Sequence, residues 1–274
     1  MRIHRVEEEV DDVIPAGRRA RRRRRSGKGN AVIRDLRHLT GAFTWNNAVR
    51  AFIFLLIFIG TFLLLEMISY AVFPAQYAAC EASVKASASA NAINSSCYME
   101  SVMFGLSMPL SVLVYLIAYR KMRLGAISKS LGLSWSKLTL GNIGVGLLLF
   151  VAVLLVEFTA GIISVAANKQ INTNAAAALV GAPIWFYLFV AFIEPINEEV
   201  LFRGFLVGRL GIIISALFFA IGHVGYNSTF EIDVIAAFIF GLLAGYVFKK
   251  RNSLYPSMMA HMLVNIVAVL AFLH

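Results

Sequence analysis

The sequence predicts an all-α fold, a polytopic membrane bundle with about seven transmembrane helices. Of its 274 residues, 59% are hydrophobic and only 15% are charged, whereas a soluble domain of this size carries about 25% charged residues. The mean hydropathy is +0.75, and apolar runs long enough to cross a bilayer recur along the chain. The composition therefore excludes an ordinary soluble domain.

The first 46 residues are polar and form the first predicted domain, a basic and disordered cytoplasmic tail. The run RRARRRRRSGK at 18–28 supplies much of the formal net charge of +10. Such a run beside a hydrophobic segment fixes membrane topology and contacts anionic lipid. Nucleic-acid binding is the less favoured alternative, because the run lacks interleaved aromatic residues. The first apolar stretch starts too late for a cleavable signal peptide, so none is expected.

The second predicted domain, residues 47–274, contains the transmembrane helices. A helix needs about 17–25 apolar residues to span a bilayer. The predicted spans lie at about 48–73, 99–119, 139–166, 183–209, 211–224, 231–248 and 256–273. The fifth span is short, and we expect its neighbours or a polar cavity to accommodate it. The fourth span is expected to turn back at Gly208–Gly211.

Lysine and arginine alternate between the predicted loops and indicate the orientation of the bundle. The cations of the second, fourth and sixth loops are Arg120, Lys121, Arg123, Lys129, Lys137, Arg209 and the KKR of 249–251. The first, third and fifth loops contain only Lys85 and Lys169. The positive-inside rule then predicts a cytoplasmic N-terminus and an external C-terminus. Cys80 and Cys97 both fall in the first outer loop, where they form a disulfide or remain two thiols.

Residues 192–204, FIEPINEEVLFRG, place charges inside an apolar span. A charge at the centre of a membrane helix costs about 2.5–3.5 kcal/mol on insertion scales. Glu199 and Arg203 are four residues apart, the spacing at which a helical ion pair forms. Glu198 points about 100° away from Glu199 and is available for another role. Pro195 removes a backbone donor and predicts a kink.

Two histidines, His223 and His261, also fall inside predicted spans, and Asn265 follows His261 on the same helical face. Counted from the turn at Gly208–Gly211, Glu198 and His223 lie at about 15 and 18 Å, level to within one helical turn. The geometry permits one polar cavity that opens to the cytoplasmic side. STFE at 228–231 fits a capping box for the next helix.

These groups could simply hold helices together by hydrogen bonds, and Glu66, Glu157 and Glu194 receive that interpretation. Together, however, intramembrane ionisable groups indicate function. A carboxylate flanked by imidazoles and an amide can activate water and stabilise an oxyanion, which suits peptide hydrolysis. The chain lacks the His-Glu-x-x-His of zincins and a pair of intramembrane aspartates, and GLSM at 105–108 is a weak nucleophile signal.

Three motifs carry a family resemblance: Glu-Glu-x-x-x-Arg at 198–203, Phe-x-x-x-His at 219–223 and His-x-x-x-Asn at 261–265. In this order they resemble the CAAX prenyl endopeptidase and bacteriocin-processing family of intramembrane endopeptidases, also called the type II CAAX protease or Abi family. The resemblance covers about residues 180–270, which would form the catalytic core.

The resemblance implies roles for six residues. Glu198 would be the general base on the attacking water, helped by His223. Glu199 would pair with Arg203 and support the site, while His261 and Asn265 would stabilise the oxyanion. No cofactor is expected on this mechanism. The residue types themselves leave an alternative open, a zinc ion held by His223, His261 and Glu198 or Glu199.

The implied substrate is a membrane-associated peptide or protein. Eukaryotic members of the family remove the last three residues of prenylated CAAX proteins, whereas many prokaryotic members are associated with peptide processing or bacteriocin immunity. This short chain without large loops resembles the prokaryotic type, so a prokaryotic cell membrane is the expected location. The alternative functions are a non-enzymatic immunity or scaffold protein and a proton-coupled transporter.

Overall fold

The computed structural model describes residues 45–86, 97–166, 182–224 and 232–273, and these residues are helical with no strand among them. Most of the predicted tail of residues 1–46 and the predicted capping box at 228–231 lie outside the described residues. The all-α membrane bundle predicted from composition is confirmed.

The helices follow the predicted spans closely. The first three spans correspond to α3 (Trp45–Val72), α5 with the π-helix η2 (Tyr98–Val114 and Tyr115–Tyr119) and α7 (Leu140–Ala166). The last two correspond to α12 (Ile232–Arg251) and α13 (Tyr255–Leu273). By length and composition, four helical stretches of the described chain could cross a membrane: Ala48–Val72, Tyr98–Tyr119, Leu140–Ile163 and Ile184–Val224.

The stretch from Ile184 to Val224 contains the fourth and fifth predicted spans. It runs through α9 (Ile184–Leu188), the π-helix η4 (Phe189–Ile193), α10 (Glu194–Glu199), the π-helix η5 (Val200–Leu206) and α11 (Val207–Val224). The helix breaks at Gly211, with φ 84° and ψ 173°, a backbone conformation that glycine adopts most readily. Beyond the break α11 packs against η5, and the Ser215 hydroxyl donates to the Phe202 carbonyl at 2.7 Å. The turn predicted at Gly208–Gly211 is confirmed.

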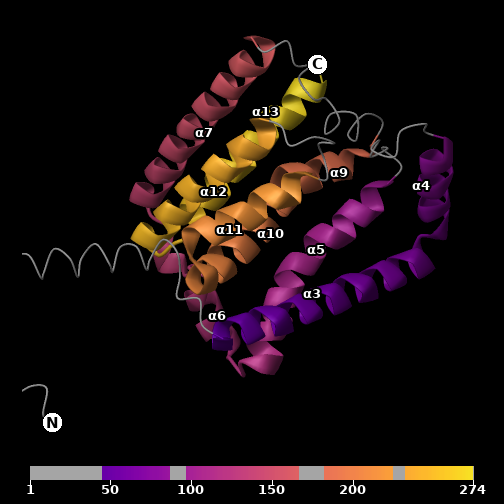
Figure 1. Cartoon of the computed structure of the whole chain (residues 1–274), viewed down its shortest axis with the longest axis horizontal. Coiled ribbons are helices and arrows are strands. Elements are labelled where there is room, and N and C mark those ends of the chain that lie inside the picture. Colours follow the sequence, from indigo (N-terminus) through magenta and orange to yellow (C-terminus); the bar gives the residue numbers. More distant parts are fainter. Residues whose placement is uncertain (1–44, 87–96, 167–181, 225–231, 274) are drawn as a thin grey trace, which may run out of the picture.

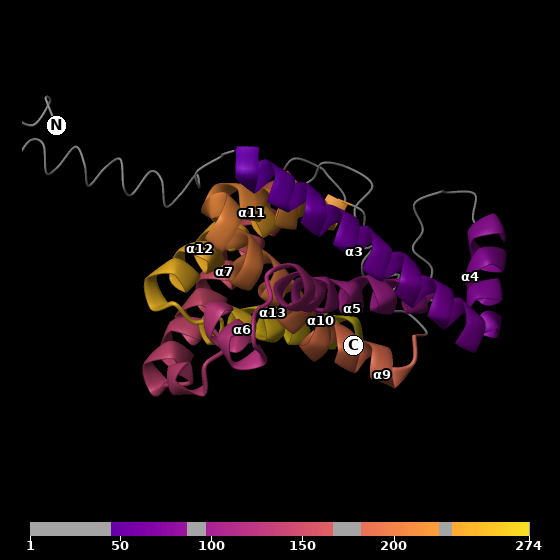
Figure 2. The same ribbon diagram turned by 90° about the horizontal axis from the view of Figure 1, so that it is seen from below.

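In Figure 1 the helices follow one another across the molecule, with α7 at one side and α3 and α4 (Pro74–Ala86) at the other. α13 packs on α7, α11 packs on α12, and α10 lies between α5 and α13. α3 packs on α5 and crosses the molecule obliquely in the view from below (Figure 2). The charged stretch of α10 therefore lies in the middle of the bundle, away from both flanks.

A close helix contact brings α12 against α11. A Cβ atom added to Gly241 would lie 2.8 Å from the Cα atom of Ala216, closer than real Cβ contacts allow. Only a glycine lets the two backbones approach this far, as small residues do in membrane helix pairs. The contact places Phe240, the residue before Gly241, beside the polar centre of the bundle.

A disulfide connects α4 to the start of α5. Cys80 of α4 and Cys97, at the start of α5, are bonded, so the alternative of two free thiols is wrong. Glu66 of α3 accepts a hydrogen bond of 2.7 Å from the Tyr77 hydroxyl. Burial raises the pKa of Tyr77 to about 12, so the phenol remains a donor at neutral pH. These contacts agree with the structural interpretation of Glu66.

Candidate active site

Four of the six predicted site residues meet at the centre of the bundle. The Nη1 atom of Arg203 lies 2.8 Å from Oε1 of Glu199, which confirms the predicted pair. The same Glu199 oxygen lies 3.2 Å from Nδ1 of His261. The other ring nitrogen of His261, Nε2, lies 3.5 Å from Oε2 of Glu198. Two adjacent glutamates from α10 are thereby joined to one histidine from α13.

The local helix geometry explains how the two glutamates are presented. α10 is flanked by two π-helices, η4 before it and η5 after it, and π-helical turns often occur at functional sites. Pro195 lies in the first turn of α10 and has no N–H to continue the preceding ladder. The sequence predicted a kink at Pro195. In the structure, the wider turns of η4 accommodate the missing N–H donor of Pro195.

Arg203 is enclosed almost completely, with its side chain 1% exposed and that of Glu199 0% exposed. Its guanidinium lies over two aromatic rings, 4.1 Å from the centroid of Phe219 and 4.7 Å from that of Phe240. Desolvated cation–π contacts of this kind contribute about 2 kcal/mol each. The rings and Glu199 together compensate for the removal of the arginine from water, which would otherwise be strongly unfavourable.

His261 is oriented by Glu199. A ring nitrogen that faces a carboxylate at hydrogen-bond distance carries the proton, so Nδ1 donates to Glu199. This contact turns Nε2 toward Glu198. The ring packs edge-on against Phe240, with centroids 4.9 Å apart, and is 8% exposed. The imidazole is therefore fixed by one carboxylate and presented to the other.

His223 occupies a neighbouring position. Its Nδ1 donates to the Phe219 carbonyl at 2.8 Å, which leaves Nε2 as an acceptor in the neutral ring. The ring is half-buried and lies 4.5 Å from the Phe219 ring, which in turn is 5.7 Å from the His261 ring. Within the part of the chain that the structure describes, His223 makes no hydrogen bond to Glu198. The structure thus places it beside the cluster, with Phe219 between the two histidines.

Asn265 lies one turn beyond His261 on α13, as predicted, but its hydrogen bond leads away from the glutamates. Its Nδ2 atom donates to the Val190 carbonyl of η4 at 2.8 Å. An amide nitrogen has two hydrogens, so this bond leaves one for another acceptor. The contact also connects α13 to the π-helix that precedes α10.

Sequence reasoning missed Phe240 of the site and also the buried amide of Asn197, which precedes the two glutamates in the chain. Phe240 lies in an apolar run with no motif around it, so nothing in the sequence distinguishes it from other phenylalanines. Asn197 is 6% exposed, and its Nδ2 has no hydrogen-bond partner among the described residues. Its position directly before the two glutamates was a signal that could have been used, because a buried amide in an apolar span requires a partner.

The described side chains do not assemble a metal site. No group of three His, Cys, Asp or Glu side chains with a geometry that could hold a metal ion occurs within the described ranges. The donors of the alternative zinc site, His223, His261 and Glu198 or Glu199, are all described, and they are not gathered as a ligand set. Zinc binding stays a prediction that chelation can test.

Comparison with known protein families matches residues 180–267 to the model of the Rce1-like type II CAAX prenyl endopeptidases. The part of the chain that is similar to this family is residues 180–267. The resemblance carried by the three motifs is confirmed, and the matched range contains all six predicted site residues. The Rce1-like family is a protease family, which supports endopeptidase activity for this membrane protein. Comparisons with curated proteins and with solved structures gave no match.

Proposed function

We propose that the protein is an intramembrane endopeptidase that hydrolyses peptide bonds of membrane-associated peptides or proteins with a water molecule activated by Glu198. The observation that carries the proposal is the division of roles between the adjacent glutamates. Glu199 contacts both Arg203 and His261, at 2.8 and 3.2 Å. Glu198 lies 3.5 Å from Nε2 of His261 and, among the described residues, forms no ion pair with Arg203. One carboxylate organises the site and the other is left to act on water.

The reaction follows from these positions. Glu198 takes a proton from water while the water oxygen attacks the carbonyl carbon of the scissile bond, and the carbonyl electron pair moves onto oxygen. His261 and the second amide hydrogen of Asn265 stabilise this oxyanion. When the tetrahedral intermediate collapses, the C–N bond breaks and Glu198 returns the proton to the leaving amine.

Arg203 and Glu199 act by positioning. The ion pair fixes Glu199 against His261, and a fixed donor is worth more in a dry site than one that must reorganise during the reaction. His223 contributes the unprotonated Nε2 of its neutral ring, which can accept a hydrogen bond from the attacking water or the substrate. The proposed substrate is presented from the membrane, because the cluster lies at the centre of an apolar bundle.

The test is a cleavage assay with purified protein in detergent and a quenched-fluorescence prenylated peptide. Glu198→Gln keeps the shape of the side chain and cannot accept the proton, so kcat should fall at least about a hundredfold. The matched control is Glu157→Gln, a carboxylate of α7 outside the cluster, which should cleave normally. Retained activity in Glu198→Gln that matches the control contradicts the proposal.

The same assay separates the metal alternative. A chelator should leave the wild-type rate unchanged if Glu198 alone activates water. Loss of activity with chelator and its return with added zinc would show a metal-bound water instead. If neither the wild-type protein nor the Glu157→Gln control cleaves the prenylated peptide, the membrane proteomes of cells that contain wild-type or Glu198→Gln protein should be compared. Uncleaved precursors should accumulate only with the variant, whereas identical proteomes favour a non-enzymatic scaffold or a transporter.

A further inference from the structure

A cavity of about 1020 Å³ lies between α3, α5, η5 and α11, and neither Glu199 nor Arg203 lines it. This volume is at the upper end of the range of about 300–1,000 Å³ that holds drug-sized ligands. Leu201 and Phe202 of η5 line it, whereas Glu198, Glu199, His223 and His261 do not. The cavity is therefore separate from the proposed catalytic cluster, although the same short helix borders both.

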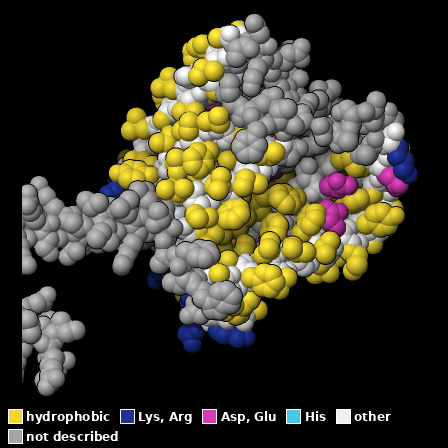
Figure 3. Space-filling model, viewed as in Figure 1, with side chains coloured by type: hydrophobic (Ala, Val, Ile, Leu, Met, Phe, Trp, Pro, Cys, Tyr) yellow, Lys and Arg dark blue, Asp and Glu magenta, His cyan; other side chains and the backbone are white. Residues whose placement is uncertain are grey.

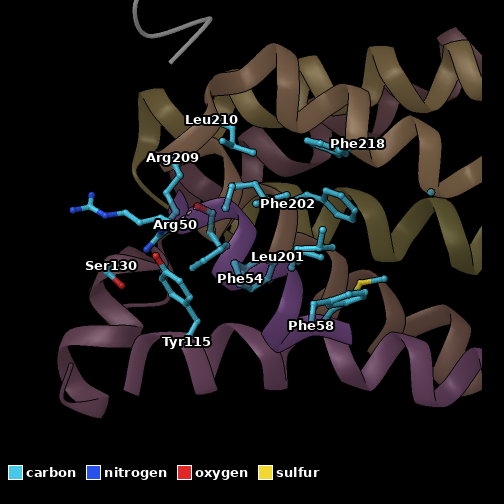
Figure 4. Close-up of a pocket in the computed structure, with 18 of the residues that line it drawn as sticks. Arg50, Phe54, Phe58, Tyr115, Ser130, Leu201, Phe202, Arg209, Leu210 and Phe218 are labelled. Carbon is cyan, nitrogen blue, oxygen red and sulfur yellow. Dashed lines mark hydrogen bonds between the residues drawn. The ribbon is translucent and has the colours of Figure 1, made fainter. Parts of the chain in front are cut away.

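One end of the cavity is cationic. Arg50, Arg120, Arg209 and Lys249 line the cavity, together with the polar side chain of Ser130. Figure 4 shows Arg50, Arg209, Ser130 and the Tyr115 hydroxyl gathered at this end.

Arg209 is held in place there. Its Nη1 donates to the Phe205 carbonyl at 2.6 Å, and its guanidinium lies 3.8 Å over the Phe205 ring. The charges of Arg120 and Arg50 act on it from close by. Within the described ranges, none of the three arginines forms an ion pair with a carboxylate. An anion at this end would relieve the repulsion among them, and arginine binds phosphate oxygens with paired hydrogen bonds.

The other end of the cavity is apolar. Figure 4 places Phe58, Leu201, Phe202 and Phe218 at this end, away from the arginines. Phe218 and Ile221 of α11 are about half exposed, at 50% and 49%. Hydrophobic side chains also cover most of the described surface on the face of the molecule that Figure 3 shows. The cavity thus combines an opening toward lipid, an apolar lining and a cationic end.

We propose that this cavity binds one anionic glycerophospholipid, with the phosphate at Arg50, Arg120 and Arg209 and an acyl chain among the phenylalanines. Three arginines match the headgroup of an anionic lipid better than the single carboxylate of a peptide. A substrate bound here would also present no bond to Glu198, which does not line the cavity. The arginine end lies at the loops predicted to be cytoplasmic, where the membrane leaflet carries anionic lipid.

The first test uses the wild-type protein in detergent and measures its melting temperature against added lipid. Phosphatidylglycerol should raise the melting temperature at a concentration at least about fivefold lower than phosphatidylcholine, since one charge near cationic residues changes affinity by that factor. Inorganic phosphate at the same concentration should have no effect. If phosphate alone gives the full shift, the site takes an anion without a chain, and if phosphatidylcholine acts equally, it is an apolar filler site; either result overturns the proposal.

The second test uses variants outside the catalytic cluster. Arg50→Gln and Arg120→Gln should each weaken the phosphatidylglycerol effect about fivefold. The matched control is Arg123→Gln, an exposed arginine three residues beyond Arg120 that does not line the cavity. It should behave as wild type. An equal loss in Arg123→Gln would mean general surface electrostatics and would overturn the site.

A third variant fills the cavity instead of changing its charge. Gly208 lines the cavity, and a Cβ atom added there meets nothing within 4 Å. Gly208→Leu should therefore fold and lose the phosphatidylglycerol effect, and unchanged lipid binding would contradict the assigned location. The cleavable peptide provides the final arm. If it displaces bound phosphatidylglycerol with a half-maximal concentration equal to its KM, the cavity is a substrate subsite and not a lipid site.

Discussion

Arg203 and Glu199 face each other in the interior of the bundle, Nη1 to Oε1 at 2.8 Å, with neither side chain more than 1% exposed. The pair contains the most deeply buried charges of the site, and two aromatic rings close over the arginine. Breaking such a pair leaves one uncompensated charge, which is far more unfavourable than removing both partners. We therefore expect the pair to be required for folding and, on the proposed mechanism, to position His261.

Arg203→Ala should destabilise the protein by about 3–5 kcal/mol, because Glu199 would keep a buried charge without its partner. For a chain of this size the melting temperature should fall by roughly 10 °C. Arg203→Lys should retain more stability and little activity, because an ammonium does not reproduce the planar contacts with Phe219 and Phe240. Thermal unfolding in detergent measures the effect, with Arg123→Ala as the exposed arginine control. A normal melting temperature for Arg203→Ala would count against the pairing.

A double-mutant cycle isolates the interaction of the pair. Glu199→Gln and Arg203→Met should each lower the free energy of unfolding. The double variant should lose less free energy of unfolding than the sum of the two single losses. The coupling should be at least about 1 kcal/mol, because the second mutation removes the charge that the first one left unpaired. Additive losses in thermal unfolding would show that the two charges are balanced by other groups.

Alanine variants of the two histidines should differ in stability but lose activity to a similar extent. His261→Ala removes the contacts to both glutamates and should cost about 1–3 kcal/mol, the range for orphaning a buried partner. His223→Ala removes a hydrogen bond within its own helix and should change the melting temperature by no more than a few degrees. Both variants should cleave at least about a hundredfold more slowly than wild type. Equal destabilisation by the two changes would contradict the arrangement.

The helices could be predicted from sequence because length and hydropathy alone decide them in a bilayer. The backbone must satisfy its own hydrogen bonds there, so an apolar run of sufficient length becomes a helix whatever surrounds it. The turn at Gly211 was also predictable, because two successive spans must be joined by a turn after the chain has crossed the membrane once. The Glu199–Arg203 pair followed from helical spacing.

The contacts between helices could not be predicted in this way. That His261 touches both glutamates, while His223 bonds to Phe219, depends on how each helix is rotated about its axis. Side-chain packing such as the close approach at Gly241 sets that rotation, and a single sequence does not reveal which glycine meets which neighbour. The π-helices around α10 were missed because Pro195 predicts an interruption without saying what form it takes.

The topology predicted from the cationic loops can be tested with reporter fusions. Fusions after Lys129, near the end of α6 (Leu124–Ser130), and after Lys250, in the last turn of α12, should report the cytoplasmic side. A fusion after Lys85 of α4 should report the external side, which also suits the neighbouring Cys80–Cys97 disulfide. An external signal at Lys250 would rule out the predicted orientation of the last two spans.

Gly241→Ala should weaken the contact that brings Phe240 over Arg203. The added methyl group would lie 2.8 Å from the Ala216 backbone, so α11 and α12 must separate, at a cost of about 1–3 kcal/mol for overpacking. The matched control is Gly161→Ala in α7, where an added Cβ meets nothing within 4 Å and helix propensity makes alanine neutral or favourable. Because the shift displaces one of the two rings over Arg203, Gly241→Ala should also lower kcat with little change in KM. Thermal unfolding and the cleavage assay measure the two effects together. A variant that unfolds earlier and yet cleaves at the wild-type rate would show that the α11–α12 contact stabilises the bundle without positioning the site.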